Sequence, residues 1–235
     1  MEYNIKLHPA QTSVLVTLRH ATRARYGELR VPTGLESDIF KYHLRKLVRA
    51  HSVVKADDGI YELTAEGKEF ANRLDDATGR EIAQPKSSML LVVRTDAGGV
   101  VRYLAHRRTR EPFRDYWGIA SAPLLRGVPA LDSAARELRK QTGIDAQFRV
   151  AGTFRVIDAR TDGTVLEDKL FCVMAAVVDD APEPSPWTGG VSQWMTKRQL
   201  LAQLKLFPTT ARTLELVEGG AVFDEAVCYY AGDEY

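Results

Sequence analysis

Apolar residues near the start of the chain recur at the three- and four-residue spacing of a helix. Val14, Leu15 and Leu18 share one face of residues 9–22, and a proline at the start of this run suits a first helical turn. The run therefore has one apolar and one polar face, which predicts packing against a core. A second, shorter helix is predicted over 26–31.

A third helix is predicted over 37–50, after the break in the chain at Pro32-Thr33-Gly34. Ser37 is expected to cap it, with Asp38 in its first turn. One face of this helix is apolar and contains Phe40, Leu44, Leu47 and Val48. The other faces are mostly polar or cationic and contain Lys41, Tyr42, Arg45, Lys46 and Arg49.

A β-hairpin is predicted directly after the third helix. Residues 52–56 and 60–63 are short β-prone runs, and they are joined through Asp57-Asp58-Gly59. The Asp-Gly pair favours a tight turn. Helices followed by a hairpin predict a small α+β domain over residues 1–74.

Residues 8–74 resemble winged helix-turn-helix regulators, whose recognition helix, wing and closing helix match the segment FKYHLRKLVRAHSVVKADDGIYELTAEGKEF. The resemblance implies that the third helix enters the major groove of double-stranded DNA. It places Lys41, Tyr42 and Arg45 near base edges, and Lys46 and Arg49 nearer phosphates. The implied DNA-binding residues are Ser37, Lys41, Tyr42, Arg45, Lys46 and Arg49.

The charges of this helix also fit a solvated surface, and the domain would then mediate dimerisation or protein contact. Asp57 and Asp58 make the tip of the predicted wing acidic, so the wing is not expected to lie against phosphates. Contact with DNA would therefore depend on the helix.

Residues 75–87 mix charges with Gly79 and Pro85 without periodicity, a composition typical of a linker. The β-prone runs that follow predict a hairpin, 89–93 with 100–104, and two longer strands over 148–156 and 170–178.

One helix is predicted among these strands, over 131–141. Gly143 is a suitable C-cap residue for it. Its apolar face contains Leu131, Ala134, Ala135 and Leu138. Strands around one clear helix predict an α/β domain over residues 88–235.

Residues 88–217 resemble the Nudix family, whose signature is GX5EX7REUXEEXGU with U an aliphatic residue. The matching stretch is REPFRDYWGIASAPLLRGVPALDSAARELRKQTGI, anchored by Arg136-Glu137-Leu138 and Gly143-Ile144. Trp117, which precedes the signature itself, and Trp194 before a C-terminal helix also fit the family's order. The resemblance implies an α/β/α sandwich with a mixed sheet.

Nudix hydrolases use the carboxylates of this signature to hold a divalent metal beside a diphosphate. Here Glu137 is the one carboxylate that remains on the helix face, because Lys140 and Gln141 replace the next two. Val128 and Ala122 replace the signature's earlier Glu and its first Gly. Lys140 can also pair with Glu137. We therefore expect no metal and no efficient hydrolysis, and we name no catalytic residue.

A cationic and aromatic run precedes the signature and could recognise a phosphorylated or nucleotide ligand through charge-assisted bonds and stacking. With the retained pair of the signature, the predicted ligand-binding residues are Arg107, Arg108, Arg110, Phe113, Arg114, Trp117, Arg136 and Glu137. The alternatives are a solvated loop with its aromatic rings in the core, and a structural ion pair between Arg136 and Glu137.

Composition narrows the class of protein. Hydrophobic residues make up 45% and charged residues 27% of the 235 residues, which is ordinary globular composition. No apolar stretch approaches the roughly 20 residues that cross a bilayer, and Cys172 and Cys228 lack the spacing of a metal site. We expect a cytoplasmic protein with no membrane partner.

The net charge of +1 is unevenly distributed. Residues 1–74 contain 12 Lys and Arg against 9 Asp and Glu, and residues 75–235 contain 20 against 22. This surplus is too small to indicate nucleic-acid binding without the placement of the charges.

The function predicted from both resemblances is a homodimeric, DNA-binding transcription regulator that senses a small nucleotide- or diphosphate-like ligand. A divergent Nudix hydrolase of a nucleoside diphosphate derivative, with Mg²⁺ or Mn²⁺, is one alternative. A non-catalytic protein-interaction module is another. The sequence identifies neither the effector nor the operator, and does not distinguish a repressor from an activator.

Overall fold

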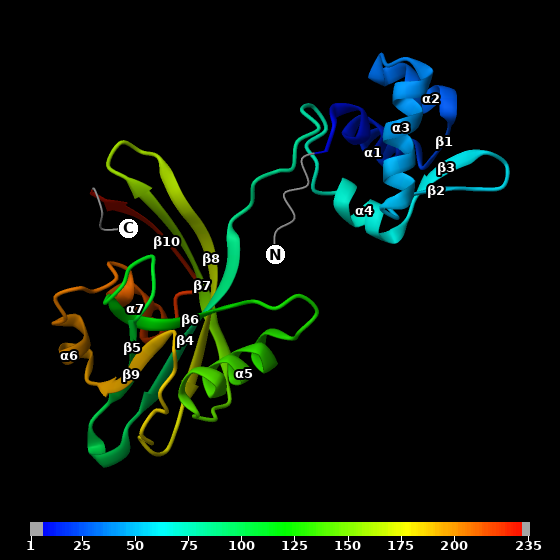
Figure 1. Ribbon diagram of the computed structural model, residues 1–235. Coiled ribbons are helices and arrows are strands. Elements are labelled where there is room, and N and C mark those ends of the chain that lie inside the picture. Colours follow the sequence, from blue (N-terminus) through cyan, green and yellow to red (C-terminus); the bar gives the residue numbers. More distant parts are fainter. Residues whose placement is uncertain (1–6, 232–235) are drawn as a thin grey trace. The chain divides into compact units, whose positions relative to one another are not determined.

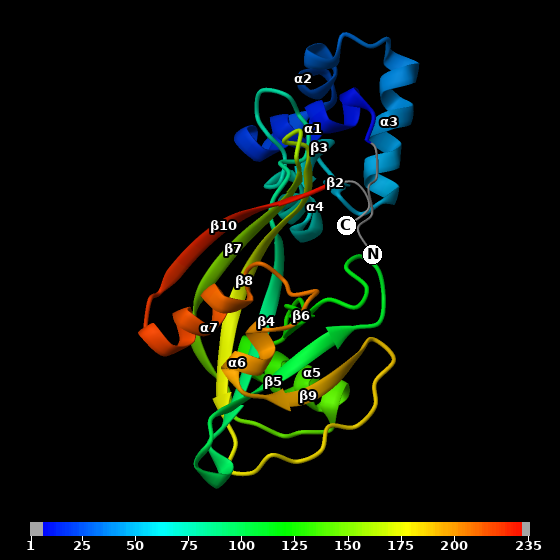
Figure 2. The same ribbon diagram turned by 90° about the vertical axis from the view of Figure 1, so that its left-hand side faces the viewer.

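The computed structural model describes residues 7–231. The chain divides into two compact units, Met1–Ala83 and Gln84–Tyr235, each with a core of its own (Figures 1 and 2).

Helices and one small sheet make up the first unit. Its elements are α1 (Pro9–Ala21), β1 (Arg23–Arg25), α2 (Tyr26–Arg30), the 3-10 turn η1 (Val31–Thr33), α3 (Ser37–Arg49), β2 (Val53–Lys55), β3 (Ile60–Leu63) and α4 (Ala65–Ala71). The predicted helices and hairpin are confirmed to within two residues. Strand β1 was not predicted, and it pairs antiparallel with β3, so that the sheet has the order β1-β3-β2.

The apolar face predicted for α3 lies in the core of this unit, where Phe40, Leu44 and Leu47 are buried. The predicted cap is wrong by one residue: Glu36 is the N-cap and makes no side-chain cap, while Ser37 is the first helical residue. The Ser37 hydroxyl lies 3.1 Å from the Tyr26 hydroxyl instead.

The segment predicted as a linker is partly ordered against the first unit. The amide of Asp75 donates to the Arg80 carbonyl, and the amide of Ile82 donates to the Arg73 carbonyl, each at 2.8 Å. Strand β4 of the second unit begins at Lys86. The connection between the two units is therefore shorter than residues 75–87.

The second unit contains β4 (Lys86–Thr95), η2 (Ala97–Gly99), β5 (Arg102–Arg108), β6 (Trp117–Pro123), α5 (Ala130–Thr142), β7 (Arg149–Arg160), β8 (Val165–Val177), β9 (Gly190–Met195), α6 (Lys197–Leu201), α7 (Thr210–Gly219) and β10 (Phe223–Tyr230). Within residues 84–231 the strands form one mixed sheet, in the order β10-β7-β8-β4-β6-β5-β9. Strand β4 is parallel to β8, and β10 is parallel to β7.

Alternate residues of β4 face the two sides of this sheet. Met89 and Leu91 pack in the cluster that contains Leu138 of α5, while Leu90 and Val92 pack in the cluster that contains Leu214 of α7. The result is a helix–sheet–helix sandwich with apolar layers on both sides of the sheet (Figure 1).

Two predictions for this unit need correction. The hairpin of 89–93 with 100–104 is limited to the pairs Arg94–Tyr103 and Thr95–Arg102, because β6 lies between β4 and β5 elsewhere. In α5, Leu131 is 45% exposed, and buried polar residues complete the inner face beside Ala134 and Leu138. The predicted C-cap is confirmed: Gly143 has a left-handed φ of 71°.

Among the residues described, no helix is both long and apolar enough to cross a membrane.

Candidate functional site

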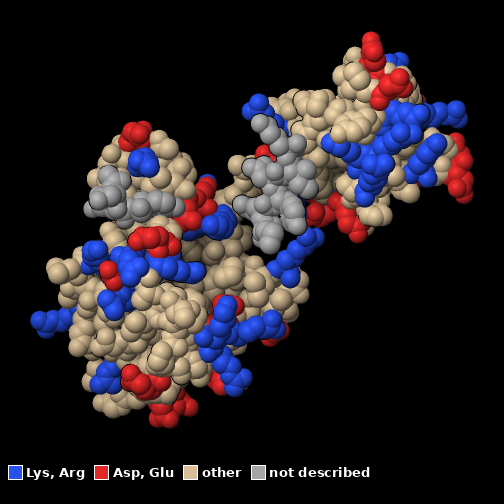
Figure 3. All heavy atoms as spheres, viewed as in Figure 1, with Lys and Arg blue, Asp and Glu red and all other residues tan. Residues whose placement is uncertain are grey.

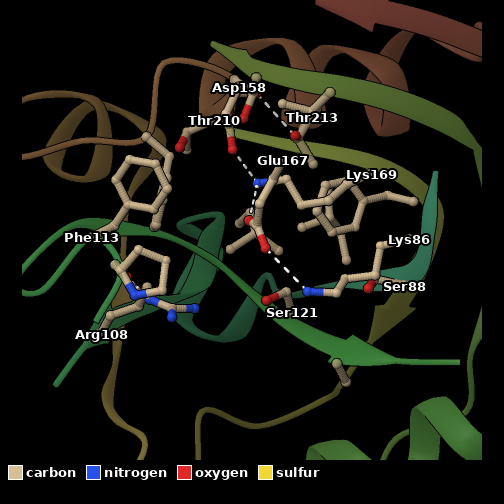
Figure 4. A pocket seen from close by; sticks show the side chains of 18 of the residues that line it. Lys86, Ser88, Arg108, Phe113, Ser121, Asp158, Glu167, Lys169, Thr210 and Thr213 are labelled. Carbon is tan, nitrogen blue, oxygen red and sulfur yellow. Dashed lines mark hydrogen bonds and ion pairs between the residues drawn. The ribbon is translucent and has the colours of Figure 1, made fainter. Parts of the chain in front are cut away.

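A pocket of about 410 Å³ lies in the second unit, beside α7 and the loop that joins β5 to β6 (Figure 4). This volume is in the range of small-molecule binding sites. Its walls combine aromatic rings, hydroxyls and charged groups from distant parts of the chain, including Ser88, Arg108, Arg110, Phe113, Ser121, Phe171, Phe207, Thr210 and Tyr230.

Four charged side chains on one side of the pocket form a chain of alternating sign (Figure 4). The ammonium of Lys169 contacts the carboxylate of Asp158 and lies 3.0 Å from Oε2 of Glu167. The Lys86 ammonium lies 3.2 Å from Oε1 of Glu167. At the other end, the Tyr230 hydroxyl donates to Asp158 Oδ1 at 3.3 Å.

Strand pairing brings these residues together. Lys86 of β4 is the register partner of Lys169 of β8, and Asp158 of β7 is the partner of Glu167. The two β8 residues are two positions apart, so they share one face of the sheet.

Burial makes the end of this network formed by Asp158 and Lys169 sensitive to the loss of either member. Asp158 is 1% exposed, and the Lys169 side chain is 15% exposed. Burial raises the pKa of Glu167, but Lys169 and Lys86 outweigh it and hold that pKa below its ordinary value. Burial, with the Asp158 carboxylate, raises the pKa of Tyr230.

Two buried threonines of α7 lie along the pocket and differ in their hydrogen bonding. The Thr213 hydroxyl donates to the Thr209 carbonyl at 2.9 Å. The Thr210 hydroxyl is buried without a hydrogen-bond partner among the described residues. Room for Thr210 depends on Gly118 of β6, where a Cβ would lie 3.1 Å from the Thr210 hydroxyl and 2.8 Å from the Phe207 ring.

The loop of residues 109–116 forms the opposite side. The Arg108 Nε donates to the Pro112 carbonyl at 2.9 Å. Phe113 is buried and has a φ of 66°, in the left-handed region that bulky residues rarely adopt. Its ring packs 4.8 Å from that of Tyr230 and 5.3 Å from that of Phe207, which hold the loop against the pocket.

Three of the predicted ligand-binding residues line this pocket: Arg108, Arg110 and Phe113. The other members of that run do not. Arg107 pairs with Asp115 at 3.3 Å and lies over the Trp117 ring, and Arg114 is exposed.

The retained residues of the Nudix-like signature also lie outside the lining. Arg136 is exposed, and Glu137 is 6% exposed. As predicted, Lys140 pairs with Glu137, with Nζ 3.4 Å from both carboxylate oxygens. Helix α5 supports the pocket wall from behind, because Gln141 donates to the Ser121 carbonyl at 3.3 Å. The described residues hold no group of three or more His, Cys, Asp or Glu placed to bind a metal.

Lys86, Asp158 and Lys169 on the charged side of the pocket were missed by sequence reasoning, although a signal for the last two was present. Asp158 continues an alternating series with the buried Phe154 and Val156, and Lys169 precedes the buried Phe171 and Val173. A charged residue at an inward position of a strand indicates a buried ion pair or a site.

A second candidate surface lies on the first unit. The predicted residues Lys41, Tyr42, Arg45, Lys46 and Arg49 are all exposed, and Figure 3 shows Lys and Arg side chains gathered over α3. A groove of about 700 Å³ runs between α3 and the β2–β3 hairpin, and its lining includes Ser37, Lys41, Arg45, Arg49 and Lys55. In the part of the chain that the structure describes, Lys41, Arg45 and Arg49 have no ion-pair partner.

The acidic hairpin has cationic partners of its own. Arg23 of β1 lies 3.3 Å from Asp58 and 2.7 Å from Glu62. The cations of α3 are therefore not neutralised by this hairpin. Beside them, Lys46 Nζ lies 4.6 Å from the centre of the Tyr42 ring.

Comparison with known proteins is informative for the fold alone. No protein-family model and no curated protein matches the chain. The Nudix domain of Shewanella oneidensis NrtR, solved with ADP ribose, is similar at 14% identity and a TM-score of 0.51, over 66% of this chain and 98% of that one. A Nudix hydrolase from Nitrosomonas europaea has 18% identity and a TM-score of 0.46, over 60% and 93%. The similarity to the NrtR domain shows that the mixed sheet and its flanking helices have a Nudix-like fold, as predicted.

Proposed function

We propose that this protein is a DNA-binding transcription regulator whose Nudix-like unit binds a small nucleotide- or diphosphate-like ligand without hydrolysing it efficiently. The observation that carries the proposal is the exposed cationic face of α3, which has no acidic partner in the described chain and lies on a different unit from the ligand pocket.

The first unit supports DNA binding through the order of its elements. A winged helix-turn-helix domain has three helices, then a hairpin and then a closing helix, and the first unit has its elements in this order. In such a domain α3 would be the recognition helix and β2–β3 the wing. Lys41, Arg45 and Arg49 recur every four residues on one side of α3. A helix with such a face can contact base edges and phosphates of one major groove.

The second unit supports ligand binding without turnover. Its pocket is built from residues outside α5, and the Glu137 carboxylate is held by Lys140. Lys140 occupies the place where a metal-binding carboxylate stands in the Nudix signature. The NrtR domain with the same fold was solved with ADP ribose, which supports a nucleotide-like ligand here.

A homodimer is part of the proposal, because regulators of this class read two half-sites about one helical turn, ~34 Å, apart. The ligand would act by favouring one arrangement of the paired recognition helices.

The experiment that tests DNA binding is fluorescence anisotropy of the full chain on DNA from upstream of its own gene, against scrambled DNA, over a salt series. We expect sequence-specific binding that is weakened by Lys41→Ala and by Arg45→Ala. A phosphate contact, unlike a base contact, contributes about 0.9 to the slope of log affinity against log salt, so the salt series separates the two kinds of contact.

Lys68→Ala is the matched control, because Lys68 is an exposed cation of α4 outside the groove. It removes the same charge and should leave the affinity within twofold. Equal losses in all three variants, or no preference for the upstream DNA, would contradict the proposal.

A further inference from the structure

The charges on one side of the pocket already balance one another. Lys86, Glu167, Lys169 and Asp158 alternate in sign and sum to zero, and each contacts a group of opposite charge (Figure 4). An anion placed at either lysine would compete with a carboxylate for it. Asp158 is 1% exposed, and a buried carboxylate without its cation is strongly unfavourable. This side of the pocket is therefore unsuited to a phosphate or another anion.

The arginines that line the pocket do not make it an anion site either. Arg108 is used by its own loop: its Nε donates to the Pro112 carbonyl at 2.9 Å, and its Nη2 donates to the Glu111 carbonyl at 3.4 Å. Arg110 is exposed and lies over the Trp187 ring, where water weakens an ionic contact. An uncharged group therefore suits this pocket better than an anion does.

Hydrogen-bond acceptors remain on the charged side. A carboxylate has about four acceptor positions on its two oxygens. Glu167 accepts from Lys86 and Lys169. Asp158 accepts from Lys169 and Tyr230. Among the described contacts each carboxylate therefore uses two positions, and the others can accept from O–H groups, which are donors that bring no charge.

The two carboxylates are close enough to bind one molecule. Asp158 and Glu167 are register partners on neighbouring antiparallel strands, so their Cβ atoms are about 5 Å apart. Both carboxylates contact the same ammonium, that of Lys169. Two hydroxyls on adjacent carbons of one ring can therefore donate to both.

A buried hydroxyl in the same pocket lacks a partner. Thr210 is 2% exposed and lines the pocket, and its hydroxyl makes no hydrogen bond among the described residues. Such hydroxyls are rare in folded proteins, because an unmade hydrogen bond is costly when it is buried. A hydroxyl of a bound molecule would supply the missing bond.

Aromatic rings adjoin these hydrogen-bonding groups. Phe113, Phe171 and Phe207 line the pocket. The Lys169 ammonium lies 5.9 Å from the centre of the Phe113 ring, so apolar surface begins beside the charged network. The flat face of such a ring can pack against the C–H face of a sugar or against a base. The pocket is thus suited to a molecule with one hydroxyl-bearing edge and one apolar face.

We propose that this pocket recognises the vicinal hydroxyls of an uncharged sugar, either a free pentose or the ribose of a nucleoside. The two hydroxyls donate to Asp158 and Glu167, the Thr210 hydroxyl bonds with the same sugar, and no phosphate enters the charged network. This recognition, which rests on the ligand-binding part of the proposed function, depends on hydroxyl groups rather than on charge.

The test is isothermal titration calorimetry of the full chain. The probes are D-ribose and 2-deoxy-D-ribose, the four ribonucleosides and their 2′,3′-dideoxy analogues, and inorganic pyrophosphate. We expect D-ribose or at least one ribonucleoside to bind, and its deoxy counterpart to bind about tenfold more weakly or worse, because a carboxylate then loses a hydrogen bond. Binding by D-ribose identifies a free-sugar site, and binding by nucleosides alone identifies the base as a further contact. Pyrophosphate should not displace the sugar.

Thr210→Val should weaken binding of the best sugar by about two- to tenfold, through loss of one hydrogen bond. Thr213→Val is the matched control. Thr213 lines the same pocket on the same helix, but its hydroxyl donates to the Thr209 carbonyl. This variant should change the affinity by less than about twofold.

Glu167→Gln replaces a charged acceptor by a neutral one of the same shape. It should reduce the preference for the sugar over its deoxy counterpart by about threefold or more, because a hydrogen bond to a charged acceptor is the stronger one. A purely structural role of Glu167 would weaken both compounds alike and leave the preference unchanged, which would overturn the assignment of the hydroxyls to this carboxylate.

The proposal would also be overturned by no binding of ribose or of any ribonucleoside, by a deoxy counterpart that binds equally well, by equal effects of the two threonine variants, or by displacement of the sugar by pyrophosphate. DNA anisotropy of the same preparations separates this failure from that of the proposed function. A protein that binds its DNA specifically and binds pyrophosphate but no sugar remains a regulator with a diphosphate-like ligand.

Discussion

Replacing Lys169 by Met should destabilise the second unit strongly, because Asp158 would lose its cation while staying buried. The Asp158 side chain is 2% exposed, and the Tyr230 hydroxyl would be its remaining hydrogen-bond donor among the contacts described above. Breaking one side of a buried ion pair costs about 3–5 kcal/mol. A loss of 1 kcal/mol lowers the Tm of a domain of this size by roughly 2–4 °C, so a fall of about 6–20 °C is expected.

The assay is differential scanning calorimetry of the full chain, with the transition of each unit followed separately. Asp158→Asn combined with Lys169→Met should recover most of the loss, because no unpaired charge then stays buried. Arg155→Met is the comparison: Arg155 pairs with Asp168 at 2.8 Å on the same two strands, but the pair is more exposed, at 37% and 27%. That variant should cost about 1 kcal/mol or less. A Lys169→Met protein no less stable than Arg155→Met would refute the reasoning.

Three further predictions concern stability and metal binding. Burial, with Arg108 and Arg110, lowers the pKa of His106 to about 4, so the folded state disfavours the charged imidazolium. Up to roughly 3 kcal/mol of stability is therefore present above pH 6.5 and is lost as the pH falls towards 4. Urea unfolding against pH should show this slope, and His106→Gln should flatten it. Gly67→Ala should lower the Tm of the first unit, since its Cβ would lie 1.8 Å from the Ser52 carbonyl oxygen; Gly27→Ala, with nothing within 4 Å, should raise the Tm slightly or leave it unchanged. Lys140→Glu should tighten Mn²⁺ binding in calorimetry. The double variant that adds Gln141→Glu should in addition have a lower Tm, because Gln141 is 3% exposed and donates to the Ser121 carbonyl.

Local patterns were sufficient for most elements of the fold. The spacing of Leu15 and Leu18, and of Phe40 and Leu44, predicted α1 and α3 because a helix shows its buried face at this period. Gly143 marked the end of α5 because it takes the left-handed conformation that ends helices.

Strands that form through pairing with distant segments could not be predicted from local sequence patterns. The three residues of β1 are a strand because they pair with β3, and nothing in Arg23-Ala24-Arg25 alone indicates this. Strand β6 lies between β4 and β5, although they precede it along the chain. Strand order depends on contacts between distant segments, and the hydrophobic period of one segment does not predict which strand lies beside it.

The residues of the candidate site are of two kinds: some lie in one short stretch of the sequence, and others are brought together only by the fold. Arg108, Arg110 and Phe113 were predicted because cations and aromatic rings gather within one short stretch. Lys86, Glu167 and Thr210 come from β4, β8 and α7, so only the register of the strands and the packing of α7 bring them to one pocket. Lys86 was also placed in the linker, where a lone lysine is most simply read as solvated.

The place of Lys86 in the chain bears on how a ligand could influence DNA binding under the proposed function. Lys86 is the first residue of β4 and follows the boundary between the units by three residues. Its ammonium is held by Glu167, which lines the same pocket. A ligand that donates a hydrogen bond to Glu167 therefore changes the anchoring of the residue from which the connection to the first unit departs. A ligand shifts an equilibrium only by its difference in affinity between two states. Lys86→Met should thus reduce the effect of ligand on DNA affinity while leaving DNA binding without ligand unchanged, and an unaltered ligand effect would exclude this route.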